Sequence, residues 1–167
     1  MYFASFPQIS YSLDGGATSF IMTDIFRRVV TKDQNLVTAF SYDEYDVVDD
    51  ETPEIVAHRV YSNAELHWII LVTNNIIDPR YDWPLSTQSL RKYVEDKYGT
   101  GNDTDIHHYV NSDGDIVHSS YTAGSKTAVT NLEYEEQLNE QKRRIKLLKP
   151  QFTESFIKNF ERVMRNG

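Results

Sequence analysis

Three histidines near the middle of the chain have the clearest potential for metal chemistry. His107 and His108 are adjacent in a stretch that reads as a β-strand, and His118 follows a turn. Adjacent side chains of a regular strand point to opposite faces of a sheet, so His107 and His108 cannot easily bind one ion. A metal site needs converging ligands and ordered supporting contacts. We therefore expect a solvated hairpin here, with no metal and no cofactor.

Acidic residues form two further groups to be weighed as sites. Residues 111–115 (Asn-Ser-Asp-Gly-Asp) weakly resemble a calcium-binding loop, but the glutamate expected at the twelfth position is missing. The Asp-Gly pair instead favours a hairpin turn. The other group surrounds a predicted helix start, where the helix dipole favours acids without any catalysis; it contains Asp49, Asp50, Glu51 and Glu54.

No arrangement typical of an enzyme accompanies these acids. A glycine-rich phosphate loop, a nucleophile elbow and a Ser/His/Asp order are all missing. We therefore expect the protein not to be an enzyme.

The composition bears on the choice of partners. The chain has 17 basic and 25 acidic residues, a net charge of −8. This sign disfavours binding to nucleic acid phosphates and to anionic membranes. The chain has no cysteine, which excludes disulfides and thiolate metal sites. We also expect no membrane span and no signal peptide, because no apolar run is long enough and the N-terminus lacks a basic region.

Residues 1–37 are expected to form an extended N-terminal arm. Their apolar residues are irregularly spaced, and Asp14-Gly15-Gly16 signals a turn. Disordered tails are usually poor in aromatics, whereas aromatic residues are enriched at protein interfaces. The alternative interpretation of residues 1–37 is a free terminus that contacts no partner. Trp83 lies in a later loop, where contact with a partner and packing within that loop are the two alternatives. The residues selected for partner contact are Phe6, Tyr11, Ile25, Phe26, Arg27, Arg28, Tyr81 and Trp83.

Residues 38–85 predict a strand followed by two helices. The strand covers residues 38–48, and Thr52 and Pro53 are suited to the start of the first helix. The second helix, 64–73, is apolar nearly all round, so other elements must cover it on more than one side. The expected core residues are Ile55, Val56, Val60, Leu66, Trp68, Ile69 and Val72.

The rest of the chain predicts an insertion and a C-terminal helix. Residues 86–144 read as a helix, a β-hairpin and a second helix capped by Asn131, with a polar loop at 119–130. Residues 145–149 alternate as a strand, which we expect to pair with the strand at 38–48, because an unpaired edge strand is a liability. Residues 150–167 predict an amphipathic helix. The fold class expected is therefore α+β.

The stretch from Val47 to Pro84 contains four motifs in a fixed order: Asp50-Glu51-Thr52, then Val56 to Tyr61, Trp68 to Asn75, and Ile77-Asp78-Pro79. In the order of these motifs the stretch resembles a LysM module. LysM modules are βααβ, so the resemblance implies that module 38–85 is completed by the late strand 145–149. The chain departs from the pattern after Pro84, where a helix replaces the closing strand.

Several motifs along the chain carry a second resemblance: Met22–Arg27, Ala57–Tyr61, Asn63, Leu66, Trp68, Asn74, 78–83, 110–114 and 139–146. On these residues the chain as a whole is similar to the baseplate wedge family of contractile-tailed, T-even-like phages known as gene product 53. The resemblance implies a structural subunit of the virion, made in the host cytoplasm, that binds other wedge and tail proteins and helps join wedges around the tail hub. Binding of peptidoglycan or chitin by the LysM-like module is the alternative function.

Overall fold

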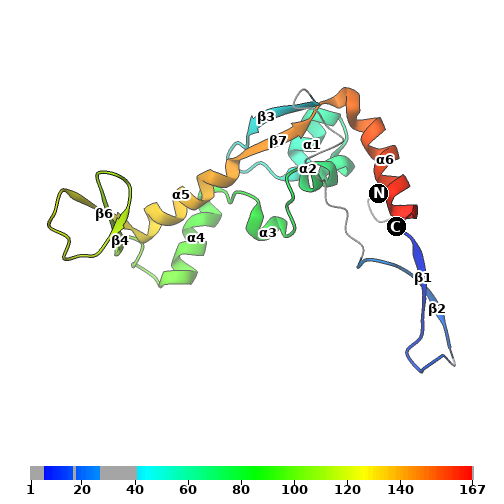
Figure 1. Ribbon diagram of the computed structural model, residues 1–167, viewed down its shortest axis with the longest axis horizontal. Helices are drawn as coiled ribbons and strands as arrows, with labels where there is room; N and C mark the ends of the chain where they lie inside the picture. Colours follow the sequence, from blue (N-terminus) through cyan, green and yellow to red (C-terminus); the bar gives the residue numbers. More distant parts are fainter. Residues whose placement is uncertain (1–5, 17, 27–40, 167) are drawn as a thin grey trace. The chain divides into compact units, whose positions relative to one another are not determined.

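The computed structural model describes residues 6–16, 18–26 and 41–166 and combines helices with small antiparallel sheets (Figure 1). This confirms the α+β class. The chain divides into two units. Unit 1 contains residues 1–45, 52–79 and 145–167, and unit 2 contains residues 46–51 and 80–144.

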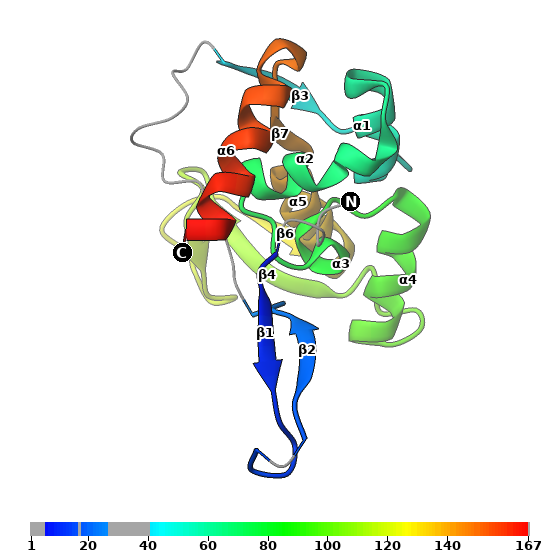
Figure 2. The same ribbon diagram turned by 90° about the vertical axis from the view of Figure 1, so that its right-hand side faces the viewer.

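The first described residues of unit 1 form a β-hairpin. Strands β1 (Gln8–Tyr11) and β2 (Phe20–Thr23) pair antiparallel, with Gln8 opposite Thr23 and Tyr11 opposite Phe20 (Figure 2). The turn signal at Asp14-Gly15-Gly16 is the loop of this hairpin, and both glycines adopt positive φ angles of 70° and 109°. The later part of the expected arm, with Arg27 and Arg28, lies outside the described residues.

The centre of unit 1 contains β3 (Tyr42–Asp46), α1 (Pro53–Tyr61), the short 3-10 helix η3 (Ala64–Leu66) and α2 (His67–Thr73). The Thr52 side chain accepts a hydrogen bond from the Ile55 N–H, and Ser62 ends α1 in the left-handed conformation. Asn63 caps η3 through the Glu65 N–H. The start signal at Thr52 and Pro53 therefore acts as the sequence predicts.

Strand β7 (Arg144–Leu148) returns to pair with β3. Backbone hydrogen bonds from Val47 N to Arg143 O and from Lys149 N to Ser41 O flank the pair, and this register is antiparallel. The Asn74 side chain holds β7 from α2, since its Nδ2 donates to Lys146 O and its Oδ1 accepts from Lys146 N, each at 2.8 Å. The expected pairing of the early and late strands is thus present.

The core of unit 1 lies between α2, β7 and α6 (Thr153–Asn166), which follows the 3-10 helix η4 (Pro150–Phe152). The Trp68 and Phe160 rings have centroids 4.7 Å apart, and Phe160 also contacts Phe6 at 6.5 Å. Phe6 therefore joins the base of the hairpin to the core. The buried members are Phe6, Trp68, Ile69, Leu148, Phe160 and Met164.

Most of the residues expected in the module core point inward. Val56, Trp68 and Ile69 are buried, Leu66 and Val72 pack against the cluster, and Val60 is half-buried. Ile55, by contrast, is 47% exposed. The buried face of α1 consists of Pro53, Val56 and Ala57, and a helix turns Ile55 away from that face.

Unit 2 consists of the last residues of α3 (Pro79–Asp82), then α4 (Thr87–Tyr98), a three-stranded sheet and α5 (Asn131–Arg143). The sheet has the order β5-β4-β6, with β4 (Ile106–Asn111), β5 (Ile116–Val117) and β6 (Lys126–Thr130). The predicted hairpin around Gly114 is present as β4 and β5.

Two features of unit 2 differ from the sequence prediction. Residues 126–130, predicted as loop, form the third strand β6 against β4. The cap of α5 is Thr130, which forms a capping box with Glu133. Asn131 instead donates its side-chain amide to Asn102 O at 2.7 Å. A hydroxyl and a glutamate three residues later are the signal that identifies this cap.

Candidate interaction surface

The hairpin of unit 1 carries apolar residues that the chain leaves exposed. In an antiparallel pair, residues opposite each other share a face, so Ile9 lies beside Met22 and Tyr11 lies beside Phe20 on one side of the ribbon. The other side carries Gln8, Ser10, Ile21 and Thr23. One face is therefore uniformly apolar, which is the pattern of a strand pair whose face is covered.

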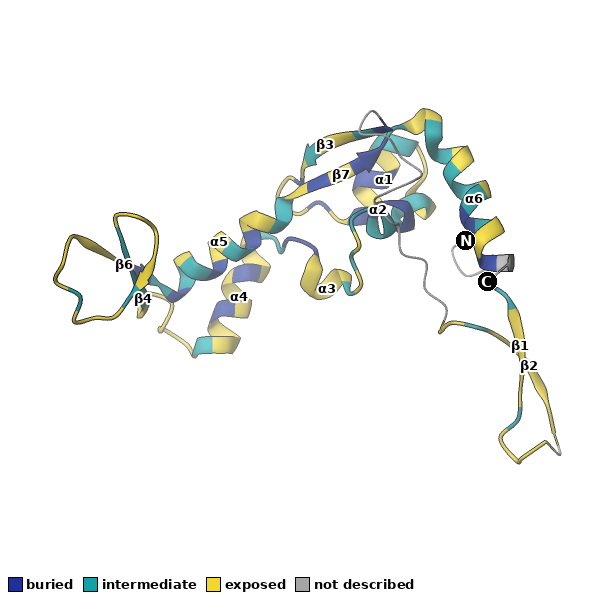
Figure 3. Ribbon diagram, in the orientation of Figure 1, coloured by how far each residue is buried: buried dark blue, intermediate teal, exposed yellow. Residues whose placement is uncertain are grey.

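This apolar face, which we call the hairpin face (Ile9, Tyr11, Phe20 and Met22), is open to solvent. Its residues are 39–52% exposed, and Figure 3 shows both strands coloured as exposed. A two-stranded hairpin is marginally stable by itself in water. Exposed apolar residues continue beyond the strands, with Leu13 in the loop and Ile25 and Phe26 after β2, and Phe26 is 92% exposed.

The loop and the base of the hairpin are held by polar contacts. Asp14 accepts hydrogen bonds from the Thr18 N–H and hydroxyl at 2.9 and 2.7 Å and from the Ser12 hydroxyl at 2.8 Å. These bonds lower the pKa of Asp14 to about 2. At the base, the Asp24 N–H donates to Pro7 O at 2.8 Å. The hairpin face is therefore presented by an ordered ribbon.

Residues selected for partner contact divide into exposed and buried ones. Tyr11, Ile25 and Phe26 are exposed, and Tyr81 in unit 2 is 67% exposed. Phe6 and Trp83 are buried in their own units, at 7% and 6% exposure. The Trp83 Nε1 donates to Glu51 O at 2.8 Å. Of the two alternatives for Trp83, the structure shows packing within its own unit.

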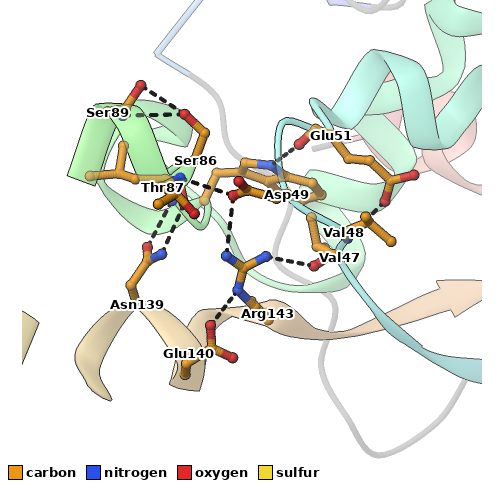
Figure 4. A network of polar contacts seen from close by, with 12 residues as sticks. Val47, Val48, Asp49, Glu51, Ser86, Thr87, Ser89, Asn139, Glu140 and Arg143 are labelled. Atoms are coloured by element: carbon orange, nitrogen blue, oxygen red, sulfur yellow. Dashed lines mark hydrogen bonds and ion pairs between the residues drawn. The ribbon is translucent and has the colours of Figure 1, made fainter. Parts of the chain in front are cut away.

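A polar network in unit 2 uses the acidic segment before α1 (Figure 4). Asp49 accepts from the Thr87 N–H at 2.9 Å and lies 3.4 Å from the Arg143 guanidinium. The hydrogen bonds from Thr87, followed by Arg143, lower the pKa of Asp49. Arg143 also donates to Val47 O at 3.0 Å and to Glu140 at 2.6 Å. Asp49 thus joins the start of α4 to the end of α5.

The histidines lie closer together than a regular strand allows. The register between β4 and β6 shifts between Ile106 and His108, and this irregularity brings the Nδ1 atoms of His107 and His108 to 2.8 Å. The His107 ring stacks on Tyr134 with centroids 4.0 Å apart. His118 instead contacts the Ser120 hydroxyl. The prediction that His107 and His108 point to opposite faces of the strand is therefore wrong, because the bulge brings their rings together.

Neither a metal cluster nor a membrane helix emerges from the described part of the chain. Across residues 6–16, 18–26 and 41–166, no three His, Asp or Glu side chains are grouped to hold a metal ion. In the same ranges no helix is long and apolar enough to cross a membrane.

Comparison with known proteins decides the family. The family model described as "Base plate wedge protein 53" matches residues 1–125. The chain belongs to this baseplate wedge family. It is also similar to the baseplate wedge protein gp53 of Enterobacteria phage T4, at 26% identity over 191 positions that cover 100% of this chain and 97% of the relative. The protein is accordingly a component of a phage tail baseplate, and hence of the virion.

The family match includes the hairpin face. It covers every described element from β1 to β5 and ends before β6, α5, β7, η4 and α6. The strand that completes the pair with β3 therefore lies outside the matched range, although the alignment with the T4 relative extends over it. An alternating apolar pattern, Ile9 and Tyr11 against Phe20 and Met22, is the sequence signal by which the hairpin face is identifiable.

Proposed function

We propose that this baseplate protein is a non-catalytic wedge subunit that binds neighbouring wedge and tail proteins through the hairpin face and so helps join wedges around the tail hub. The observation that carries the proposal is the apolar side of the β1–β2 ribbon, which has the residue pattern of a covered sheet face but is exposed in the isolated chain. A contractile-tail baseplate supplies proteins to cover it.

The energetics favour protein rather than solvent on this face. Burial of apolar surface contributes roughly 25 cal/mol per Å², so completing the burial of each half-exposed side chain contributes on the order of 1 kcal/mol. The ribbon also offers its two outer strand edges for added backbone hydrogen bonds. Protein partners are proposed in preference to nucleic acid or membrane because the net charge of −8 repels both.

The remaining domains are proposed to support this contact. Residues 38–85 with strand 145–149 form a LysM-like βααβ module, and residues 86–144 are an insertion in it. The order β3, α1, α2, β7 and the pairing of β3 with β7 support this reading. We assign the module a structural role, with no glycan bound and no cofactor required, and we assign the C-terminal helix 150–167 to the support of its core.

An assembly assay with altered hairpin residues tests the proposal. Tyr11→Thr and Phe20→Thr together remove the largest apolar pair of the hairpin face while threonine preserves strand propensity. We expect the double variant to retain the urea midpoint of the wild-type protein but to lose incorporation into baseplates assembled with the other wedge proteins. The matched control, Ile21→Thr, alters the opposite side of the same ribbon and should assemble normally.

Hydrogen exchange gives a second readout. The backbone amides of residues 8–11 and 20–23 should exchange more slowly in the assembled baseplate than in the isolated protein. Full incorporation of the double variant, together with unchanged exchange of these amides on assembly, would show that the hairpin face is not the contact.

A further inference from the structure

Unit 2 contains a groove that neither the family match nor the proposed hairpin contact explains. The groove has a volume of about 590 Å³ and lies between α4 and α5, with α3 at one end. Its apolar lining comes from Leu85, Leu90 and Leu138, and Tyr81 and Tyr93 also line it. These tyrosines are 67% and 38% exposed, so their rings remain accessible.

The two helices present continuous faces to this groove. The α4 side includes Ser89, Tyr93 and Lys97, and the α5 side includes Glu135, Leu138 and Lys142, both at helical spacing. The helices run antiparallel, because Lys97 at the end of α4 contacts Glu135 near the start of α5. Two adjacent antiparallel helices with an apolar trough are a geometry that receives a third amphipathic segment.

The charge of the groove has the opposite sign to the charge of the whole chain. Four basic residues line it, Arg80, Lys92, Lys97 and Lys142, against two acidic ones, Asp96 and Glu135. The whole chain carries −8. Lys97 and Glu135 pair with each other at 2.7 Å. The Lys142 Nζ donates to Tyr81 O at 2.7 Å, so this ammonium lies at the α3 end of the groove. An acidic ligand is attracted there.

We propose that the groove between α4 and α5 binds an acidic amphipathic segment of a neighbouring baseplate protein. Its carboxylates pair with Arg80 and Lys142, and its apolar side chains pack on the leucine floor beside Tyr81 and Tyr93. This contact rests on the proposed function as a wedge subunit, but it uses unit 2 and is separate from the hairpin face. Tyr81, which the sequence predicts to contact a partner, is then part of this contact, next to Arg80 and Lys142.

Cross-linking in assembled tails tests the proposal directly. The chain has no cysteine, so a single introduced thiol can carry a benzophenone cross-linker. Ser89→Cys places it in the groove, and Gln88→Cys places it outside the lining on the same helix. We expect Ser89→Cys to cross-link at least tenfold more and to capture a segment of another baseplate protein with more acidic than basic residues. Equal yields from both positions, capture of a basic segment, or capture of a second copy of this chain would overturn the proposal.

Charge reversal provides the second measurement. Arg80→Glu with Lys142→Glu should reduce incorporation into baseplates at least tenfold, with an unchanged circular dichroism spectrum. The matched control, Lys158→Glu with Arg162→Glu, makes the same charge change on exposed positions of α6 and should assemble normally. Normal assembly of the groove variant would overturn the groove contact alone. Normal assembly of the Tyr11→Thr/Phe20→Thr variant, together with unchanged exchange of the hairpin amides, would overturn the hairpin contact alone.

Discussion

Lys97 and Glu135 form an ion pair in unit 2 with 2.7 Å between Nζ and Oε1, and the two side chains differ in burial. The Glu135 side chain is 5% exposed, whereas the Lys97 side chain is 42% exposed. The Tyr98 hydroxyl donates to the same carboxylate oxygen at 2.7 Å. Glu135 is therefore the buried member of the pair. Two donors from the end of α4, the Lys97 ammonium and the Tyr98 hydroxyl, stabilise its negative charge.

Removal of the lysine should destabilise the protein. Lys97→Met preserves the aliphatic stem but deprives the buried carboxylate of its cation, and the expected loss in the free energy of unfolding is about 1–3 kcal/mol. The partial exposure of Lys97 places this value below that of a fully buried pair. Urea denaturation measures the change. The control is Lys158→Met, whose partner Glu154 is exposed and whose removal should leave the midpoint unchanged. Equal effects of the two variants would contradict this account.

The same carboxylate should contribute to the pH dependence of stability. Burial acts to raise the pKa of Glu135, but the hydrogen bonds from Lys97 and Tyr98 outweigh it, and the pKa lies below the ordinary value of 4.5. A lowered folded-state pKa gives stability that is present above pH 4.5 and is lost as the pH falls through the folded-state value.

Glu135→Gln isolates this contribution from those of Asp49, Glu133 and the other carboxyls. The difference in unfolding free energy between the wild-type protein and Glu135→Gln should be largest near neutral pH and should narrow as the pH falls from about 5 toward 3. Urea titrations at several pH values measure it. A difference that stays constant across this range would show that ionisation of Glu135 does not stabilise the fold.

Asn139 should be essential for the connection between α3 and α4. Its Oδ1 accepts from Leu85 N at 2.7 Å, and its Nδ2 donates to Leu85 O at 2.9 Å. Asn139→Ala leaves two backbone groups without these partners, at an expected cost of about 2–3 kcal/mol in the free energy of unfolding. Gln137→Ala on the exposed side of α5 should change it by less than about 0.5 kcal/mol. Equal stability of the two variants would contradict the proposed role of the amide.

Phe6 and Phe26 lie on either side of the hairpin in sequence, one buried and one exposed, so replacing each by alanine tests which ring anchors the hairpin. Phe6→Ala removes a buried ring from the core of unit 1 and should cost about 3 kcal/mol. The Asp24 amide, which is bonded to Pro7 O, should then exchange faster. Phe26→Ala removes a ring that is 92% exposed and should leave the stability of the isolated chain within about 0.5 kcal/mol. A similar loss in both variants would show that Phe6 does not anchor the hairpin.

Short-range signals in the sequence predicted individual helices and strands better than they predicted which elements pack around each of them. Thr52-Pro53 is a start signal that depends on neighbouring residues, and it precedes the helix expected. The strand at 145–149 was identifiable from its alternation, and its pairing followed from the need to cover an edge. The short strand β6 was missed because residues 119–130 are polar and their pairing depends on β4, distant in sequence.

Burial of single residues was harder to predict from the sequence. Phe6 looked like part of an exposed arm, but its burial depends on Phe160 and Trp68, which are far along the chain. The groove between α4 and α5 was not predicted for the same reason, since only Tyr81 was selected from its lining. Periodicity identifies the apolar face of a helix, whereas the element that covers it is set by tertiary packing.

The pairing of β3 with β7 has a consequence for biosynthesis. The two strands enclose the whole stretch 47–143, so a ribosome must release β7 before the β3–β7 sheet can close. Until then the apolar surface of α2 has neither Leu148 nor Phe160 against it, and unit 2 has time to fold first. Non-local strand pairing is slow to form, and nascent chains that stall before β7 should therefore be the species most dependent on chaperones.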